Sequence, residues 1–256
     1  MTSPPRHPYL DHPAPLAFAH RGGAAGGLEN TAAAFERAAR VGYRYAETDV
    51  HATLDGRLVA FHDATLDRVT DGRGRIAELP WRRVREARVD GREPVPLFEE
   101  LLDSLPGLRW NVDVKEEAAL RPLLELLERT GAWDRVCLGS FSEARVARAQ
   151  KLAGPRLATS LGVRGVLALR LRSWGPPVPL RRTAVCAQVP VAQSGLPVAD
   201  GRFVRAAHRA GLQVHVWTVD DPQQMHRLLD LGVDGIMTDR IETLRAVLEQ
   251  RGAWAG

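Results

Sequence analysis

Strand-like runs alternate with helical patterns along most of the chain, and this alternation limits the possible fold more than any other feature. Eight short runs rich in apolar and β-branched residues occur among the 256 residues. They are LAFAHR, YAETDVHAT, LRWNVDVK, RVCLGSF, RLATSLGV, TAVCAQVPV, LQVHVWTV and VDGIMTD. Eight strand–helix units fit a parallel barrel better than an open doubly wound sheet, which usually has fewer strands. The sequence therefore predicts an α/β fold, a TIM-type (β/α)8 barrel, with an open sheet as the alternative.

Two stretches depart from this repeat. Residues 1–15 hold five prolines and no apolar periodicity, which predicts a mobile N-terminal arm ahead of a single barrel domain over residues 16–256. The stretch from about residue 64 to residue 107 is too long for an ordinary loop between a strand and a helix. We expect it to form a small insertion after the second strand that covers one end of the barrel.

Charge and hydropathy exclude several classes of protein. The net charge is only +4, and acids stand beside arginines in pairs such as Arg85-Glu86, so we expect no nucleic-acid partner, while anionic small molecules are favoured. No run approaches the roughly 18 apolar residues that span a bilayer, and the first residues lack a secretory signal. Cys137 and Cys186 are too few for a disulfide framework. We expect a cytoplasmic protein without stable membrane insertion; the sequence does not specify its oligomeric state.

A β-hairpin is predicted directly after the second strand-like run. Asp55-Gly56 between two such runs is a strong hairpin signal. If these two residues form the turn, His62 lies opposite Asp49, and Glu47 lies on the same face of the strand. Three polar groups would then converge at one point of the barrel.

Three carboxylates form a candidate metal site at the expected mouth of the barrel. Glu47 and Asp49 lie near the end of the second strand, and Asp113 lies near the end of the third. Carboxylates without a thiolate are hard oxygen ligands, which suit Ca²⁺ or Mg²⁺. Because buried like charges normally need a cation, we favour metal binding over the alternative of solvated acids paired with arginines.

Two histidines and two cations complete the candidate site. His20 and His62 stand at strand ends beside other charges, and imidazole titrates near neutral pH, so we predict that they act as the catalytic acid and base. Arg21 and Lys115 face the same mouth, where two cations beside a divalent metal suit a phosphate group. Arg21 pairing only with Glu47 is the alternative.

The start of the first helix and one strand histidine are assigned structural roles. Asn30 and Thr31 are predicted to cap the helix that follows them, while Glu29 is placed to orient Arg21. His215, in the middle of a strand, is interpreted as a structural residue.

These residues together resemble one known family, the glycerophosphodiester phosphodiesterases. The similarity covers roughly residues 17 to 240. The matching motifs, in the order and spacing of that family, are His20-Arg21-Gly22, Glu29-Asn30-Thr31, Glu47-x-Asp49, Asp55-Gly56, His62-Asp63-x-Thr65-Leu66-x-Arg68, Asn111-Val112-Asp113-Val114-Lys115, Ser140-Phe141, Trp217-Thr218-Val219 and Thr238-Asp239. Each motif alone is weak evidence, but the set is highly specific.

The resemblance implies an enzyme that uses a divalent cation, often Ca²⁺ or Mg²⁺, to hydrolyse glycerophosphodiesters to glycerol 3-phosphate and an alcohol. It also implies that a substrate hydroxyl attacks phosphorus to give a cyclic phosphate, which water then opens. By the same resemblance the metal is held by Glu47, Asp49 and Asp113, although many members have glutamate at the position of Asp113. Trp217 is expected to line the substrate pocket, with a core position as an equal alternative.

Two other functions stay open. Similar barrels include lysophospholipase D enzymes, which share the histidines and acids but accept lipid tails. A barrel that binds a phosphate ligand without turnover is the second alternative, although the intact pair of His20 and His62 argues against it.

Overall fold

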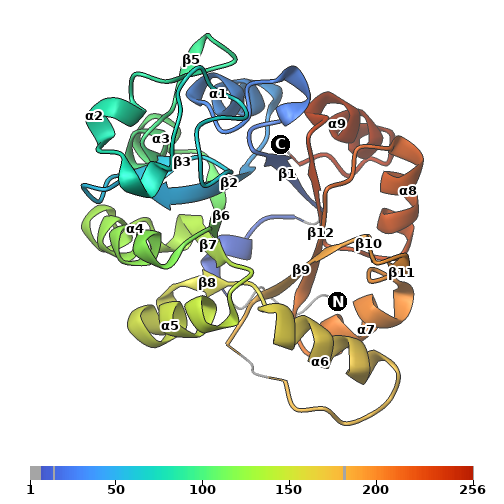
Figure 1. Cartoon of the computed structure of the whole chain (residues 1–256). Coiled ribbons are helices and arrows are strands. Elements are labelled where there is room, and N and C mark those ends of the chain that lie inside the picture. Colours follow the sequence, from blue (N-terminus) through green and yellow to red (C-terminus); the bar gives the residue numbers. More distant parts are fainter. Residues whose placement is uncertain (1–6, 14, 181–182, 256) are drawn as a thin grey trace.

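Eight parallel strands ringed by helices form a barrel (Figure 1). The computed structural model of the protein describes residues 7–13, 15–180 and 183–255. The barrel strands are β1 (Leu16–His20), β2 (Tyr45–Ala52), β6 (Arg109–Val114), β7 (Val136–Gly139), β8 (Ala158–Thr159), β9 (Cys186–Pro190), β12 (Gln213–Trp217) and β13 (Gly235–Thr238). Each corresponds to one of the eight strand-like runs, so the predicted TIM-type barrel is confirmed and the open sheet is wrong.

The barrel closes between β8 and β9. The strands follow the order β8-β7-β6-β2-β1-β13-β12-β9, and a parallel bridge between Ser160 and Cys186 joins the two ends. The backbone N–H of Leu161 also donates to the carbonyl of Cys186 (2.9 Å). Phe18 and Tyr45 fill the interior together with both cysteines, which are buried free thiols. The lower part of the barrel is therefore packed core.

The outer layer consists of helices that begin and end at residues with specific conformations. They are α1 (Ala32–Val41), α3 (Phe98–Ser104), α4 (Glu117–Thr130), α5 (Glu143–Ala153), α6 (Val163–Ser173), α7 (Gly201–Arg209), α8 (Pro222–Asp230) and α9 (Ile241–Gln250). The Thr31 hydroxyl caps α1 by accepting from the N–H of Ala34, and Gly42 ends the helix in a left-handed conformation (φ 103°). In the part of the chain described, no helix is long and apolar enough to cross a membrane.

The hairpin after β2 forms, but its predicted register is wrong by one residue. β2 pairs with β3 (Leu58–Ala60) so that His51 faces Val59. The loop has three residues instead of two, because Gly56 takes a left-handed conformation (φ 76°) after the turn and Thr53 pairs with Arg57. The strand ends at Ala60, so His62 lies beyond the pairing region and is not held opposite Asp49.

The predicted insertion is present, with narrower limits. It contains α2 (Trp81–Val84), β4 (Arg88–Val89) and β5 (Glu93–Pro94), and it lies at the upper left of Figure 1. It has its own hydrophobic cluster, which includes Ile76 and Val89. The helix α3, expected within it, packs instead in the main barrel cluster around Trp110, so the insertion ends before residue 98.

The prediction of a mobile arm is wrong for residues 7–13; residues 1–6 and 14 lie outside the described chain. Tyr9 is fully buried and Leu10 nearly so. Tyr45 donates a hydrogen bond from its hydroxyl to the carbonyl of Tyr9 (2.7 Å), and Arg109 donates to the carbonyl of Asp11 (2.8 Å). The sequence did not indicate this packing, because Tyr9 and Leu10, among several prolines, form too short an apolar stretch to show any periodicity.

Candidate active site

The candidate residues come together at the carboxyl ends of the strands. His20 ends β1 and lies in register with Glu47 on β2. Asp49 on the same strand lies in register with Asp113 on β6. Residues two apart on a strand share a face, so the three carboxylates point into the same mouth.

The three carboxylates are buried or largely buried, and their pKa values are shifted in different directions. Burial and the neighbouring Asp49 raise the pKa of Glu47 to about 8. Burial also raises the pKa of Asp113, against the opposing effect of Lys115. For Asp49 the penalty of burial is outweighed by Lys115 and Arg21, which lower its pKa. Three carboxylates thus share the mouth with two fixed cations, Arg21 and Lys115, and the ionised form of Glu47 is the one disfavoured most.

Both predicted phosphate-binding cations contact these carboxylates. Lys115 Nζ lies 2.7 Å from Asp49 Oδ1 and 2.8 Å from Asp113 Oδ2. Arg21 Nε lies 3.3 Å from Asp49 Oδ2, and the backbone N–H of Arg21 donates to Glu47 (3.2 Å). The alternative that Arg21 pairs only with Glu47 is therefore wrong, since its side chain contacts Asp49.

The carboxylates fit a hard cation. No three acidic, histidine or cysteine side chains within the described ranges are arranged to hold a metal as they stand, and the Lys115 ammonium lies between Asp49 and Asp113. However, Oδ1 of Asp113 is buried without a hydrogen-bond partner there. This orphaned oxygen and the raised pKa of Glu47 are both features that a bound Ca²⁺ or Mg²⁺ would relieve.

His20 is oriented by a carboxylate that the sequence analysis did not single out. Its Nδ1 donates to Asp239 Oδ1 (2.7 Å), and its Nε2 lies 3.6 Å from Glu47 Oε2. Burial alone would lower the pKa of His20, but Glu47 and Asp239 outweigh it and raise the pKa. The ring is thereby fixed with Nε2 toward the mouth.

His62 has a matching partner and is linked through other charged residues to Arg21, which contacts Asp49. Its Nδ1 donates to Asp63 Oδ1 (2.6 Å), and Arg68 donates to both Asp63 and Glu29. Glu29 Oε1 also accepts from Arg21 (3.1 Å), so a chain of charged contacts runs from His62 to Arg21. The predicted orienting role of Glu29 fits this arrangement.

Sequence reasoning missed three supporting residues. Asp63, Arg68 and Asp239 appear in the matching motifs, but no spacing rule connects them to the histidines. Asn30 was expected to cap α1; instead its side chain donates to Asp49 Oδ2 (3.0 Å), and Thr31 alone caps the helix. Asn30 has a left-handed backbone (φ 57°), a conformation that asparagine tolerates but that the sequence alone does not reveal.

The side of the mouth that lies away from the charged residues of β1 and β2 is apolar. Trp217, at the end of β12, is half-buried and meets the ring of Phe141 edge-on at 5.9 Å. Phe141 is 67% exposed, and its ring lies 6.0 Å from Lys115 Nζ. His215, below Trp217 on the same strand, is buried against Phe18 and stays structural.

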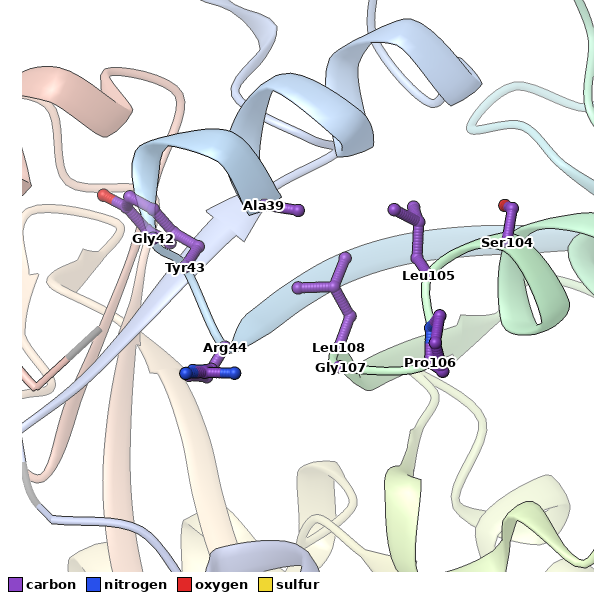
Figure 2. Close-up of a pocket in the computed structure, with 9 residues that line it drawn as sticks. All are labelled: Ala39, Gly42, Tyr43, Arg44, Ser104, Leu105, Pro106, Gly107 and Leu108. Atoms are coloured by element: carbon purple, nitrogen blue, oxygen red, sulfur yellow. The ribbon is translucent and has the colours of Figure 1, made fainter.

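A cavity at the other end of the barrel is not the site. Figure 2 shows it, with a volume of about 270 Å³, lined by Tyr43, Arg44 and residues 104–108 among others. These residues precede β2 and β6, so the cavity lies at the amino ends of the strands. Its lining residues include no carboxylate, imidazole or thiol.

Comparison with known proteins decides the family. The model of the glycerophosphoryl diester phosphodiesterase family matches residues 20–243, a range that contains all the site residues described above. The chain belongs to this family. The predicted enzyme class and reaction, hydrolysis of glycerophosphodiesters, are thereby confirmed.

The phosphodiesterase has similar relatives over nearly its whole length. A probable glycerophosphodiester phosphodiesterase 2 of Mycobacterium tuberculosis is 44% identical, over 97% of this chain and 96% of the relative. The crystal structure of a glycerophosphodiester phosphodiesterase from Agrobacterium tumefaciens has a TM-score of 0.77 and 25% identity, covering 90% of this chain and 99% of that one. A phosphodiesterase from Oleispira antarctica, solved with the product sn-glycerol-3-phosphate, has a TM-score of 0.75 at 21% identity, covering 92% and 97%.

Proposed function

We propose that this phosphodiesterase releases glycerol 3-phosphate by a metal-dependent reaction with two histidines. The observation that carries the proposal is the pair of carboxylate-oriented imidazoles, His20 with Asp239 and His62 with Asp63, on a mouth that holds buried carboxylates. The product bound to the Oleispira antarctica phosphodiesterase supports the choice of substrate.

Each side chain has a defined task in this reaction. Glu47, Asp49 and Asp113 hold the divalent cation, Ca²⁺ or Mg²⁺. When bound, the cation offsets negative charge on the phosphate. Arg21 and Lys115 bind the phosphate oxygens at the same mouth.

The two histidines move protons at opposite sides of phosphorus. Nε2 of His20 accepts the proton of the attacking hydroxyl, either of the substrate itself or of water. His62 donates a proton to the oxygen of the departing alcohol, and the roles reverse when water opens a cyclic phosphate. Asp239 and Asp63 keep each ring in the tautomer that these transfers require.

The experiment is release of glycerol 3-phosphate from glycerophosphocholine and glycerophosphoethanolamine with Ca²⁺, with Mg²⁺ and with EDTA. We expect release with at least one cation and loss of release in EDTA. Equal turnover in EDTA would contradict the carboxylate metal site. Tight binding of the diester without product would favour the non-catalytic barrel.

A lysophospholipid is the second candidate substrate. The exposed ring of Phe141 beside Trp217 gives one side of the mouth an apolar surface on which an acyl chain can lie. Choline release from lysophosphatidylcholine but not from glycerophosphocholine would favour this candidate. The cytoplasmic location and the absence of a nucleic-acid partner stay predictions.

A further inference from the structure

One long segment of the chain contains no acidic residue. Residues 144–199 carry nine arginines and lysines and neither aspartate nor glutamate. The net charge of the whole chain is only +4, so the rest of the molecule has an excess of acids. The interleaving of arginines with acids expected from the sequence therefore fails in this segment, which begins after Glu143, the first residue of α5, and includes α6 and β9.

The helix α6 turns an apolar stripe outward. Val163, Leu167 and Trp174 are 57%, 58% and 60% exposed, and Leu171 is half-buried. Their spacings of four, four and three residues place all four side chains on one face of the helix. Isolated exposed apolar residues are ordinary, but a continuous stripe is not.

The opposite face of α6 makes the contacts with the barrel. Leu169 is fully buried, and Arg170 forms an ion pair with Asp200 (2.7 Å), at the start of α7. Figure 1 shows α6 in the outer ring between α5 and α7. Arg170 borders the stripe, and its guanidinium lies 5.2 Å from the centre of the Trp174 ring, while Val163 and Leu167 project away from the barrel.

Cationic side chains border the stripe. Arg164 and Arg172 are exposed on α6, and neither forms an ion pair with a carboxylate of the described residues. Apolar side chains and tryptophan that enter the acyl boundary, with arginines at the headgroups, are the chemistry of a helix that lies on an anionic bilayer.

We propose that the outward face of α6, with its apolar stripe and the bordering Arg164 and Arg172, binds the surface of an anionic lipid bilayer. This face reaches the mouth of the barrel, because Val163 follows the carboxyl end of β8. Exposed Phe141 and Leu196 follow β7 and β9, the neighbouring strands, at the same end. Contact through this face brings the rim of the active site to the level of the headgroups.

Other occupants fit the face less well. A second copy related by a two-fold axis would bring one arginine-rich surface against another, with Glu143, whose carboxylate lies at the start of α6, as the acid near Arg164. Nucleic acid would pair with the arginines but would leave Leu167 and Trp174 against phosphate and sugar. Only a lipid surface uses both the charge and the stripe.

Flotation of the full chain with vesicles tests the proposal. We expect binding to vesicles of equal parts phosphatidylcholine and phosphatidylglycerol, none to phosphatidylcholine alone, and release by salt. The double variant Leu167→Ser/Trp174→Ser should weaken binding at least about tenfold. The single substitutions Arg164→Gln and Arg172→Gln should each weaken vesicle binding roughly fivefold.

Matched controls separate this surface from general effects. Leu54→Ser removes an equally exposed leucine on the β2–β3 hairpin, and Arg121→Gln removes an exposed arginine on α4; both should bind vesicles as the parent does. All variants should hydrolyse glycerophosphocholine at the parent rate, so the outcome is independent of the catalytic proposal. Unchanged vesicle binding in the double variant, loss of binding in the controls, or binding of duplex DNA in preference to vesicles would overturn the inference.

Discussion

Each of the two imidazoles that we propose to be catalytic has a neighbouring carboxylate. Asp239 and Asp63 accept from Nδ1 of His20 and His62 at 2.7 and 2.6 Å. Such partners fix the ring and its tautomer, so their removal changes the rate without removing the imidazole.

The substitution Asp239→Asn should lower kcat at least about tenfold, because the amide no longer stabilises the protonated ring of His20. Steady-state kinetics on glycerophosphocholine measures this change, with KM and calorimetric Ca²⁺ affinity expected near the parent values. Asp221→Asn, which alters the cap of α8 instead, is the control and should retain kcat. A kcat of Asp239→Asn equal to that of the parent would contradict the proposal that Asp239 orients His20.

Substitutions in the site should separate proton transfer from metal binding. His20→Ala and His62→Ala should each abolish turnover while metal affinity, measured by calorimetry, stays nearly unchanged. Asp49→Asn should weaken metal binding first, since it removes a charged ligand from the centre of the carboxylate group. The reverse pattern would show that the roles are wrongly assigned.

Asp63 also links stability to pH. Hydrogen bonding from Arg68 is the main cause that lowers the pKa of Asp63 to about 2. The unfolded carboxyl has a pKa of about 3.9, so the ionised group stabilises the fold above that value, and the stabilisation is lost as pH falls through about 2. Urea unfolding should show Asp63→Asn less stable than the parent near neutral pH. The difference should shrink as pH falls from about 4 and vanish below about pH 2; a constant difference at every pH would contradict this linkage.

At the scale of elements, the strands were predictable and their exact pairing was not. Alternating apolar runs indicated all eight barrel strands, because each must bury side chains on both faces. The register of the β2–β3 hairpin depends on whether Gly56 lies inside a two-residue turn or ends a three-residue loop. The sequence Asp55-Gly56 suits both, so the error of one residue at His62 could not be avoided from local signals.

Gly56 should be sensitive to any side chain. Its φ is 76° and a Cβ there would meet nothing within 4 Å, so Gly56→Ala introduces backbone strain alone. We expect a loss of about 1 kcal/mol in the free energy of unfolding, measured with denaturant. Gly107→Ala, where φ is not in the left-handed range, is the control and should change stability little. Equal stability of both variants would argue against the left-handed loop.

At the scale of the whole molecule, contacts between distant segments escaped the sequence analysis. Asp239 meets His20 across 219 residues, and Tyr9 packs on Tyr45 in an edge-on contact of 5.4 Å. Periodicity describes one element at a time, whereas these contacts arise only when the barrel closes. The candidate residues at the mouth were predictable because every parallel strand presents its carboxyl end there.

The N-terminal segment should contribute strongly to global stability. Tyr9→Ala removes a fully buried ring, and we expect a loss of about 3 kcal/mol in the free energy of unfolding. Phe141→Ala is the matched control, since its ring is 67% exposed and should contribute little. Chemical denaturation compares the two. A negligible change in the free energy of unfolding for Tyr9→Ala would instead support the prediction of a mobile arm.

The insertion between β3 and α3 has a hydrophobic cluster of its own, yet it reaches the chemistry only through residues near its start, Asp63 and Arg68. We expect that such a segment can be replaced by the corresponding segment of a relative. Grafts from relatives that retain residues 61–68 should fold on the same barrel and preserve its proton-transfer groups. Recombination at one loop would therefore replace a whole hydrophobic cluster of the molecule while the proposed catalytic groups are inherited intact.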